Sequence, residues 1–111
     1  MDYLYNFEIY FPLKDKDGNE INPQKLFEVK DEIVSRFGGI TMTPIFGSPV
    51  YNGFWKSPKT KRVVKDKNSI FIVLTAQDEE SINFFRNKKL EWTRNLNYEE
   101  LLITVHEVQA L

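Results

Sequence analysis

The stretch YLYNFEIYF, residues 3–11, alternates between two kinds of side chain and sets the fold of the chain. One side of it is aromatic or aliphatic throughout, whereas the other side carries Asn6, Glu8 and Tyr10. Side chains of a β-strand point alternately to its two faces, so this pattern predicts a strand that is buried on one face and half-covered on the other. Pro12 ends the strand, because proline cannot donate a hydrogen bond to a neighbour.

The chain after Pro12 predicts a turn and then a helix. The segment DKDGNE, residues 15–20, fits an Asp-Gly turn. It fails as a calcium loop, because its glycine stands fourth instead of sixth and the twelfth position is Leu26. Asn22 followed by proline is typical of a helix start, apolar residues then recur every three or four positions, and Gly38 suits the end. We therefore expect a helix over residues 23–37 and no metal site.

The middle of the chain predicts a second strand and a hairpin. Residues 40–46 are β-rich, residues 47–49 (GSP) predict a bend, and extended structure resumes over residues 50–56. The sequence Ser-Pro-Lys-Thr at 57–60 is typical of a tight turn with proline at its second position. A two-residue tip at Pro58 and Lys59 would place Trp55 opposite Arg62 and Phe54 opposite Val63.

The last third of the chain predicts a central strand, a helix and a final strand. Residues 69–75, SIFIVLT, are apolar on both faces, which is typical of a central strand. Asp78 suits the start of a helix whose core side uses Ile82, Phe85, Trp92 and Leu96. Residues 101–108 alternate again, with Thr104 and His106 on one side.

The predicted element order is β-α-β-β-α-β, which indicates a ferredoxin-like α+β plait formed by one domain, residues 1–111. In such a plait a four-stranded antiparallel sheet carries both helices on one face, and here the second and third strands form an extended hairpin. The first and last strands would be neighbours, so Asn6, Glu8, Tyr10, Thr104 and His106 would share the open face. That face must be solvated, covered by a second subunit or used as a pocket.

Composition limits the possible functions. The 111 residues contain no cysteine and one histidine, which excludes disulfides, a thiolate zinc site and a cysteine nucleophile. The formal net charge is −1, so the chain as a whole does not attract nucleic acid or an anionic membrane. The N-terminus alternates instead of running apolar and lacks a basic start, so we expect no secretory signal, no membrane span and a cytoplasmic protein. We expect no cofactor.

Glu8, Tyr10 and His106 form the one plausible acid–base set. A carboxylate beside an imidazole fixes its tautomer and raises its proton affinity, and a tyrosine can donate to an oxyanion. The structural alternative is a group of surface residues on adjacent strands, or a polar patch in a dimer interface. A catalytic role for these residues is therefore a hypothesis about the open face.

A second candidate site is the basic segment 56–67, in which six Lys or Arg residues stand against Asp66. The residues proposed to bind a partner are Trp55, Lys56, Lys59, Lys61 and Arg62. Basic side chains with aromatic neighbours can hold phosphates and stack a base, or they can grip an acidic protein. The structural alternative is a solvated hairpin whose lysines prevent edge-to-edge pairing, with Arg62 over the Trp55 ring.

The element order, together with RFGGIT, GFW, SIFIVLT and YEELLITV, resembles small uncharacterised bacterial domains of the ferredoxin-like superfamily. That superfamily includes the RNA-recognition motifs and the dimeric α+β-barrel proteins. The strand at 69–75 lacks the basic-glycine-aromatic opening of an RNA-recognition motif. The resemblance to the dimeric barrels implies pairing of open sheet faces, and in some of those proteins a pocket for a small aromatic molecule or haem.

The sequence thus predicts a bacterial or phage protein that acts as a homo-oligomeric, non-catalytic binding module through its open sheet face. The first alternative is a small-molecule enzyme or ligand-binding protein that uses Glu8, Tyr10 and His106. The second is a nucleotide or nucleic-acid binder that uses the 56–67 hairpin. Self-association is the expected partnership, and a protein, nucleotide or small-molecule partner remains open.

Overall fold

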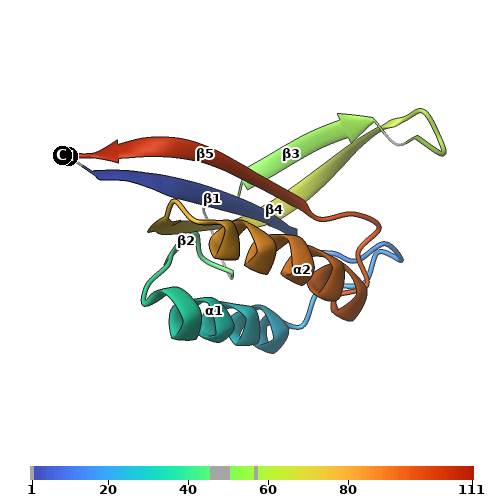
Figure 1. Ribbon diagram of the computed structural model, residues 1–111. Helices are drawn as coiled ribbons and strands as arrows, with labels where there is room; N and C mark the ends of the chain where they lie inside the picture. Colours follow the sequence, from blue (N-terminus) through green and yellow to red (C-terminus); the bar gives the residue numbers. More distant parts are fainter. Residues whose placement is uncertain (1, 46–50, 57) are drawn as a thin grey trace.

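The computed structural model describes residues 2–45, 51–56 and 58–111, with the backbone alone at residues 51, 52, 55 and 64 (Figure 1). Within these residues the chain is an α+β protein with two helices and a five-stranded antiparallel sheet. In chain order the elements are β1 (Asp2–Pro12), α1 (Pro23–Phe37), β2 (Thr41–Met42), β3 (Tyr51–Lys56), β4 (Val63–Ala76), α2 (Glu79–Asn95) and β5 (Leu102–Ala110).

The strands lie in the order β2-β4-β1-β5, and β3 pairs with the first half of β4. β1 is flanked by β4 and β5, so Phe7 lies opposite Val73 on one side and Val105 on the other. The prediction that the first and last strands are neighbours is therefore confirmed. β4 begins earlier than the apolar run at 69–75 because its first residues pair only with β3.

The predicted long second strand is wrong, because two short strands occupy its place. β2 pairs only through Thr41 and Met42, and β3 pairs further along the same edge of β4. Pro44 has no N–H to continue the ladder, and Thr43 completes the pairing instead: its backbone N–H donates to the Ile70 carbonyl at 3.0 Å, and its hydroxyl accepts from the Ile70 N–H at 2.9 Å. The bend predicted at residues 47–49 lies outside the described residues.

The predicted register of the hairpin is also wrong by two residues. Trp55 lies opposite Val64 and Phe54 opposite Lys65, and the pairing ends at Lys56 and Val63. The tip is therefore longer than two residues. Lys61 adopts a left-handed conformation with φ of 61°, which lengthens the turn and carries Arg62 out of register with Trp55.

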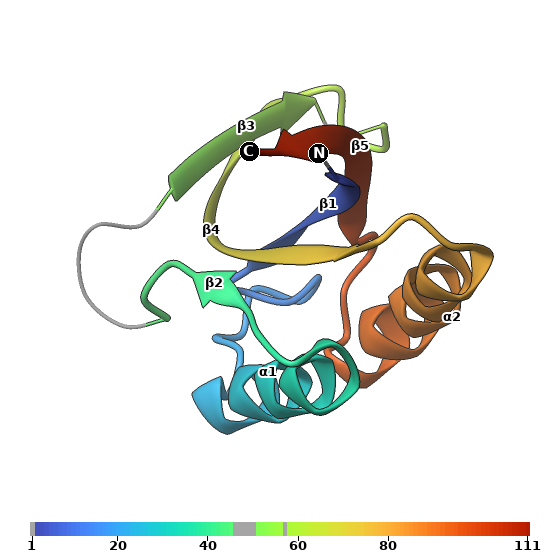
Figure 2. The ribbon, with the colours of Figure 1, turned by 60° about the vertical axis from the view of Figure 1, so that its left-hand side comes forward.

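Both helices lie on the same face of the sheet, as Figures 1 and 2 show. The bounds predicted for α1 are confirmed, with the Asn22 side chain accepting from the Gln24 N–H and Gly38 ending the helix at φ of 87°. The Asp78 side chain likewise caps α2 by accepting from the Ser81 N–H at 2.7 Å. The core between sheet and helices contains Phe7, Ile9, Phe11, Leu26, Ile33, Phe71, Val73, Phe85, Trp92 and Leu101.

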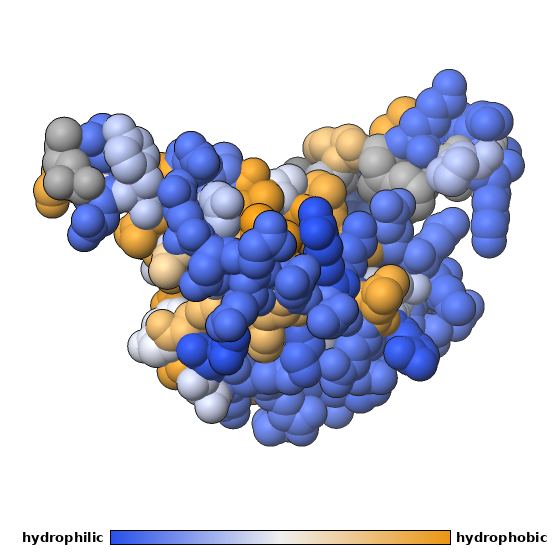
Figure 3. Space-filling view, viewed as in Figure 1, coloured by the Kyte–Doolittle hydropathy of each residue, from blue (hydrophilic) through white to orange (hydrophobic). Residues whose placement is uncertain are grey.

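Within the described residues, the other face of the sheet carries no helix. The paired ends of β1 and β5 project to one side of the molecule and the β3–β4 hairpin projects to the other (Figure 1). The surface is hollowed between these two projections, and apolar side chains are visible there among polar ones (Figure 3). None of the helices in the described part of the chain is long and apolar enough to cross a membrane.

Candidate active site

The open face of β1 and β5 carries five polar side chains that lie close together. The backbone register places Glu8 opposite Thr104 and Asn6 opposite His106, and Tyr10 follows on the same face of β1. All three β1 residues are half-buried, whereas Phe7 and Ile9 between them point into the core. Aliphatic residues of β4 lie beside them, since Ile72 pairs with Glu8 and Leu74 with Asn6. We call Asn6, Glu8, Tyr10, Thr104 and His106 the sheet-face cluster.

Within this cluster the Tyr10 hydroxyl donates a hydrogen bond to Glu8 Oε2 at 2.6 Å. This bond is the main reason that the pKa of Tyr10 is raised above its usual value. Partial burial and the negative charge of Glu8 raise that pKa further, whereas a hydrogen bond with Thr104 acts in the opposite direction. Tyr10 is therefore held as a neutral phenol whose proton is engaged by the Glu8 carboxylate.

His106 pairs with Asn6 instead of with Glu8. The Asn6 amide nitrogen lies 3.4 Å from His106 Nε2, whose role as donor or acceptor depends on the imidazole tautomer. The other amide atom, Asn6 Oδ1, is buried and has no hydrogen-bond partner in the described structure. Leaving such a group unsatisfied costs about 1–3 kcal/mol, so a donor supplied by a ligand or a water would be stabilised there.

The described hydrogen bonds therefore divide the predicted acid–base set into two pairs, Tyr10 with Glu8 and His106 with Asn6. The sequence placed Asn6 and Thr104 on this face but did not assign them to the site. The signal that could have done so is the register between β1 and β5. That register sets which residue lies opposite which across a sequence separation of 100 residues.

No group of three or more metal-ligating side chains is arranged to hold a metal ion in residues 2–45, 51–56 and 58–111. The Asp15 carboxylate shows why its loop is a structural turn. It accepts from the backbone N–H groups of Asp17 and Asn19 and from the Asn97 amide, and these bonds lower the pKa of Asp15. Gly18 completes the turn with φ of 82°.

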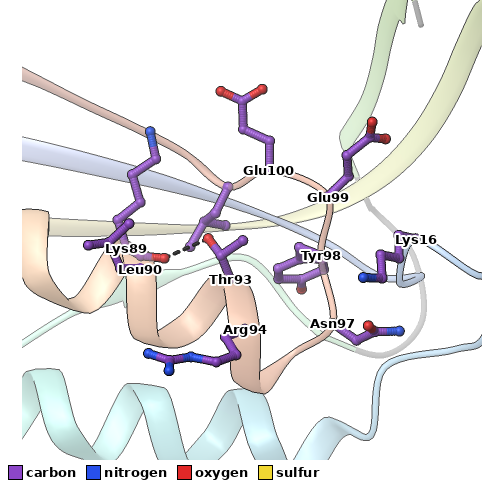
Figure 4. Close-up of a pocket in the computed structure, with 10 residues that line it drawn as sticks. Lys16, Lys89, Leu90, Thr93, Arg94, Asn97, Tyr98, Glu99 and Glu100 are labelled. Atoms are coloured by element: carbon purple, nitrogen blue, oxygen red, sulfur yellow. Dashed lines mark hydrogen bonds between the residues drawn. The ribbon is translucent and has the colours of Figure 1, made fainter. Parts of the chain in front are cut away.

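A pocket of about 420 Å³ lies at the end of α2, under the loop that leads to β5 (Figure 4). The hydroxyl groups that line this pocket form hydrogen bonds with backbone carbonyls. The Tyr98 hydroxyl donates to the Pro12 carbonyl at 2.6 Å, and the Thr93 hydroxyl donates to the Lys89 carbonyl at 2.5 Å. Lys89 and Arg94 extend in different directions and do not converge on a common point. The pocket therefore offers a ligand few free groups.

A second pocket, of about 540 Å³, lies between α1 and α2 and is lined by structural polar contacts. Glu32 accepts from Trp92 Nε1 at 3.1 Å and also pairs with Lys88. The hydrogen bond between Glu32 and Lys88 is the main reason that the pKa of Lys88 is raised, and the hydrogen bond between Glu91 and Lys88 is the second. These contacts tie the two helices together.

The basic residues predicted to bind a partner lie on the hairpin, away from the sheet-face cluster. Lys56, Lys59, Lys61 and Arg62 are all exposed. Lys59 Nζ lies 4.0 Å from Glu99 Oε1, and both of these side chains are exposed to solvent. The side chain of Trp55, and with it the expected stacking of Arg62 on its ring, lies outside the described residues.

No protein-family model matches the sequence, and no curated protein is significantly similar to it. A solved structure does share the fold: a phage SAM lyase in complex with S-methyl-5'-thioadenosine. It is 11% identical in sequence, with a TM-score of 0.66, and the match covers 96% of this chain and 90% of that one.

This likeness corrects three expectations drawn from the sequence. The fold over nearly the whole chain is that of a lyase, instead of an uncharacterised bacterial domain or a dimeric α+β-barrel protein. The expectation of a non-catalytic interaction module, and with it the view that the chain is more likely not an enzyme, is contradicted by the same finding, because the fold is shared with an enzyme. Sequence reasoning missed the relationship because 11% identity leaves no recognisable motif.

The raised pKa of Tyr10 gives a direct check on the sheet-face cluster. Neutral Tyr10 is stabilised by the Glu8 carboxylate, so its contribution to stability is present below the usual tyrosine pKa and is lost as the pH rises through the raised value. We expect Glu8→Gln to lower the Tyr10 pKa toward its usual value. Alkaline titration of the protein labelled with ¹³C at tyrosine Cζ, followed by NMR, measures this pKa, and Tyr10→Phe assigns the signal.

Glu107→Gln is the matched control for this titration. Glu107 lies on the same strand as His106 but pairs with Tyr5 on the opposite face, and it is exposed. Its replacement should leave the Tyr10 pKa unchanged. An unchanged pKa in Glu8→Gln would contradict the described contact.

Proposed function

We propose that this chain is a small-molecule enzyme that binds S-adenosylmethionine on its open sheet face and cleaves it to S-methyl-5'-thioadenosine. One observation carries the proposal: the chain shares its fold, over 96% of its length, with a SAM lyase bound to that thioadenosine. The sheet-face cluster supports it, because this cluster combines a carboxylate, a neutral phenol and an unsatisfied acceptor on a hollowed face.

The chemistry of the two compounds defines the bond that breaks. S-methyl-5'-thioadenosine is S-adenosylmethionine without its aminobutyrate group, so the bond broken joins the sulfonium sulfur to the γ-carbon. The sulfur keeps the electron pair and becomes a neutral thioether. The aminobutyrate group can leave in one of two ways. A base removes a proton from the carbon next to the γ-carbon to give an alkene, or the substrate's own carboxylate attacks the γ-carbon and closes a lactone.

The sheet-face cluster has a role in each route. Glu8 carries the negative charge that a sulfonium or ammonium group requires nearby, and it lies where it could also take a proton. Tyr10 donates to Glu8 and fixes its orientation. Asn6 Oδ1 is buried beside the cluster, so a turn of this amide would be needed for it to accept from an N–H group of the ligand. Ile70 and Ile72 of β4, on the same face, offer a half-buried apolar surface for the adenine ring.

The proposal includes the finer description of the fold, a ferredoxin-like plait formed by one domain over residues 1–111. What supports it is the strand order, with β1 and β4 at the centre and both helices on one face. S-adenosylmethionine is an intracellular metabolite, so the proposal includes a cytoplasmic place of action. Self-association stays a prediction, which sedimentation of the purified chain would test.

Incubation of the purified protein with S-adenosylmethionine tests the activity. We expect S-methyl-5'-thioadenosine to form in proportion to enzyme concentration and well above the spontaneous breakdown of the substrate, as measured by liquid chromatography with mass spectrometry. S-adenosylhomocysteine is the matched control substrate. It has a neutral thioether in place of the sulfonium, so its sulfur is a poor leaving group and no cleavage is expected.

Binding of the thioadenosine gives a second readout. A ligand that binds only the folded state raises the melting temperature with concentration, and at about 100 times its dissociation constant it stabilises by about 2.7 kcal/mol. If the melting temperature does not move and no thioadenosine forms above the blank, the proposal is overturned.

A further inference from the structure

The β3–β4 hairpin is not part of the proposed active site. The hairpin projects from the molecule and is positively charged, and these two features favour binding of an anionic partner. We define the basic arm as β3, the described part of the loop after it and the first residues of β4, residues 51–56 and 58–67. We propose that the basic arm binds single-stranded nucleic acid, with its lysines on the phosphates and Phe54 against a base. This inference is independent of the proposed lyase activity.

The basic arm extends beyond the body of the protein and approaches it at the tip, where Lys59 Nζ lies 4.0 Å from Glu99 Oε1. β1 pairs with β4 only from Asn68 to Ala76, so the part of β4 before Asn68 has β3 as its partner. The resulting two-stranded hairpin projects from one end of the molecule, as Figures 1 and 3 show. Both of its faces are therefore accessible beyond the edge of the sheet.

One face of the basic arm is basic and aromatic. The register places Phe54 opposite Lys65, Lys56 opposite Val63, and Asn52 opposite Lys67, so Lys56, Lys65 and Lys67 share a face with Phe54. Lys65 Nζ lies 5.9 Å from the centre of the Phe54 ring. Phe54 is 67% exposed, so the ring does not serve the core. Lys59, Lys61 and Arg62 extend the positive charge to the tip.

The spacing of these charges fits a phosphate backbone. Residues two apart on a strand are separated by about 6.6–6.8 Å, which separates Lys65 from Lys67. The backbone of a single strand is flexible, so its phosphates can follow two lysines at this separation. Asp66 pairs with Gly53 and therefore lies on the opposite face.

A single strand fits the basic arm better than an acidic protein does. Protein interfaces are depleted in lysine and depend on a buried apolar centre, whereas this face offers one aromatic ring among lysines. An exposed ring can stack on a base only where the base is unpaired, and such stacking tolerates any base. The arrangement therefore favours binding of single strands without sequence preference.

The test is the binding of a fluorescent oligonucleotide of about 20 thymidines, measured by anisotropy at several salt concentrations. Six cations on the phosphates of a single strand predict an affinity that falls roughly 300-fold between about 50 and about 200 mM salt. A duplex of the same length should bind more weakly, because its bases are not free to stack on Phe54.

Two variants of equal net charge locate the binding. The triple variant Lys56→Gln, Lys65→Gln and Lys67→Gln should bind weakly and reduce the salt dependence to roughly 20-fold over the same range. Lys14→Gln, Lys16→Gln and Arg86→Gln remove the same charge from exposed positions elsewhere and should leave binding close to the parent. Phe54→Ala should weaken binding roughly 5-fold or more, and Phe54→Trp should restore it.

Three results would overturn the inference. One is the absence of oligonucleotide binding at low salt, and another is an equal loss in the two triple variants, which would indicate a nonspecific effect of net charge. The third is binding of poly-glutamate as tightly as the oligonucleotide, which would indicate an acidic protein partner. Binding that survives Glu8→Gln unchanged would support the separation of the basic arm from the active site.

Discussion

Glu8→Gln is expected to lower kcat/KM for S-adenosylmethionine by about 100-fold or more, which is the usual scale for loss of a charged or acid–base group at a reacting centre. Glutamine keeps the size of the side chain and an acceptor oxygen for Tyr10. The variant therefore removes the negative charge and the capacity to take a proton, with little change in shape. Steady-state formation of S-methyl-5'-thioadenosine measures the loss.

The kinetic constants and the second product show which role Glu8 has. If Glu8 is a general base, the second product is an alkene, 2-aminobut-3-enoate. Loss of the base then lowers kcat. If Glu8 is instead a counter-ion for the cationic substrate, the substrate's own carboxylate closes the lactone. Loss of the Glu8 charge then raises KM. The alkene and the lactone are isomers of equal mass, so NMR of the product mixture distinguishes them: the alkene shows vinyl protons, whereas the lactone does not and hydrolyses to homoserine.

Glu107→Gln provides the control for this prediction too, because it makes the same chemical change on the opposite face of the sheet. It should retain the activity of the parent. If Glu8→Gln remained as active as Glu107→Gln, with both proteins folded by circular dichroism, the sheet-face cluster would not be the active site. Binding of the thioadenosine by the parent would then have to be located elsewhere.

Local signals in the sequence predict the elements that local interactions stabilise. Helix α1 has the predicted bounds because its ends are set by neighbouring residues, the Asn22 cap and the left-handed Gly38. The alternation of residues 3–11 likewise assigns each side chain of β1 to the correct face, since one face must be buried. The same alternation identified Asn6, Glu8 and Tyr10 as residues of the open face.

The features that sequence reasoning missed depend on pairing between strands. The two-residue error in the hairpin register arises from a loop whose length is set by the conformation of Lys61. The hairpin itself was predicted, but the basic arm has no core face whose apolar pattern could set its register. The contact of Asn6 with His106 also requires the register of β5 on β1, which no local pattern encodes.

The largest effect on stability is expected from Phe85→Ala, which removes the ring at the centre of the aromatic core. Phe85 is 2% exposed and stacks on Phe7 with ring centres 4.2 Å apart. Its ring also lies 5.4 Å from that of Phe37 and 6.4 Å from that of Trp92, so it joins β1 to both helices. Truncation of a buried phenylalanine costs about 3–5 kcal/mol.

That loss is a large fraction of the free energy of unfolding of a small domain, about 5–15 kcal/mol. Urea denaturation followed by circular dichroism measures it as a lower midpoint with an unchanged slope. Phe54→Ala makes the same chemical change at a ring that is 67% exposed, and its effect should stay within about 0.5 kcal/mol. Equal destabilisation by the two variants would contradict the described core, because it would mean that burial of Phe85 between sheet and helices does not contribute to folding.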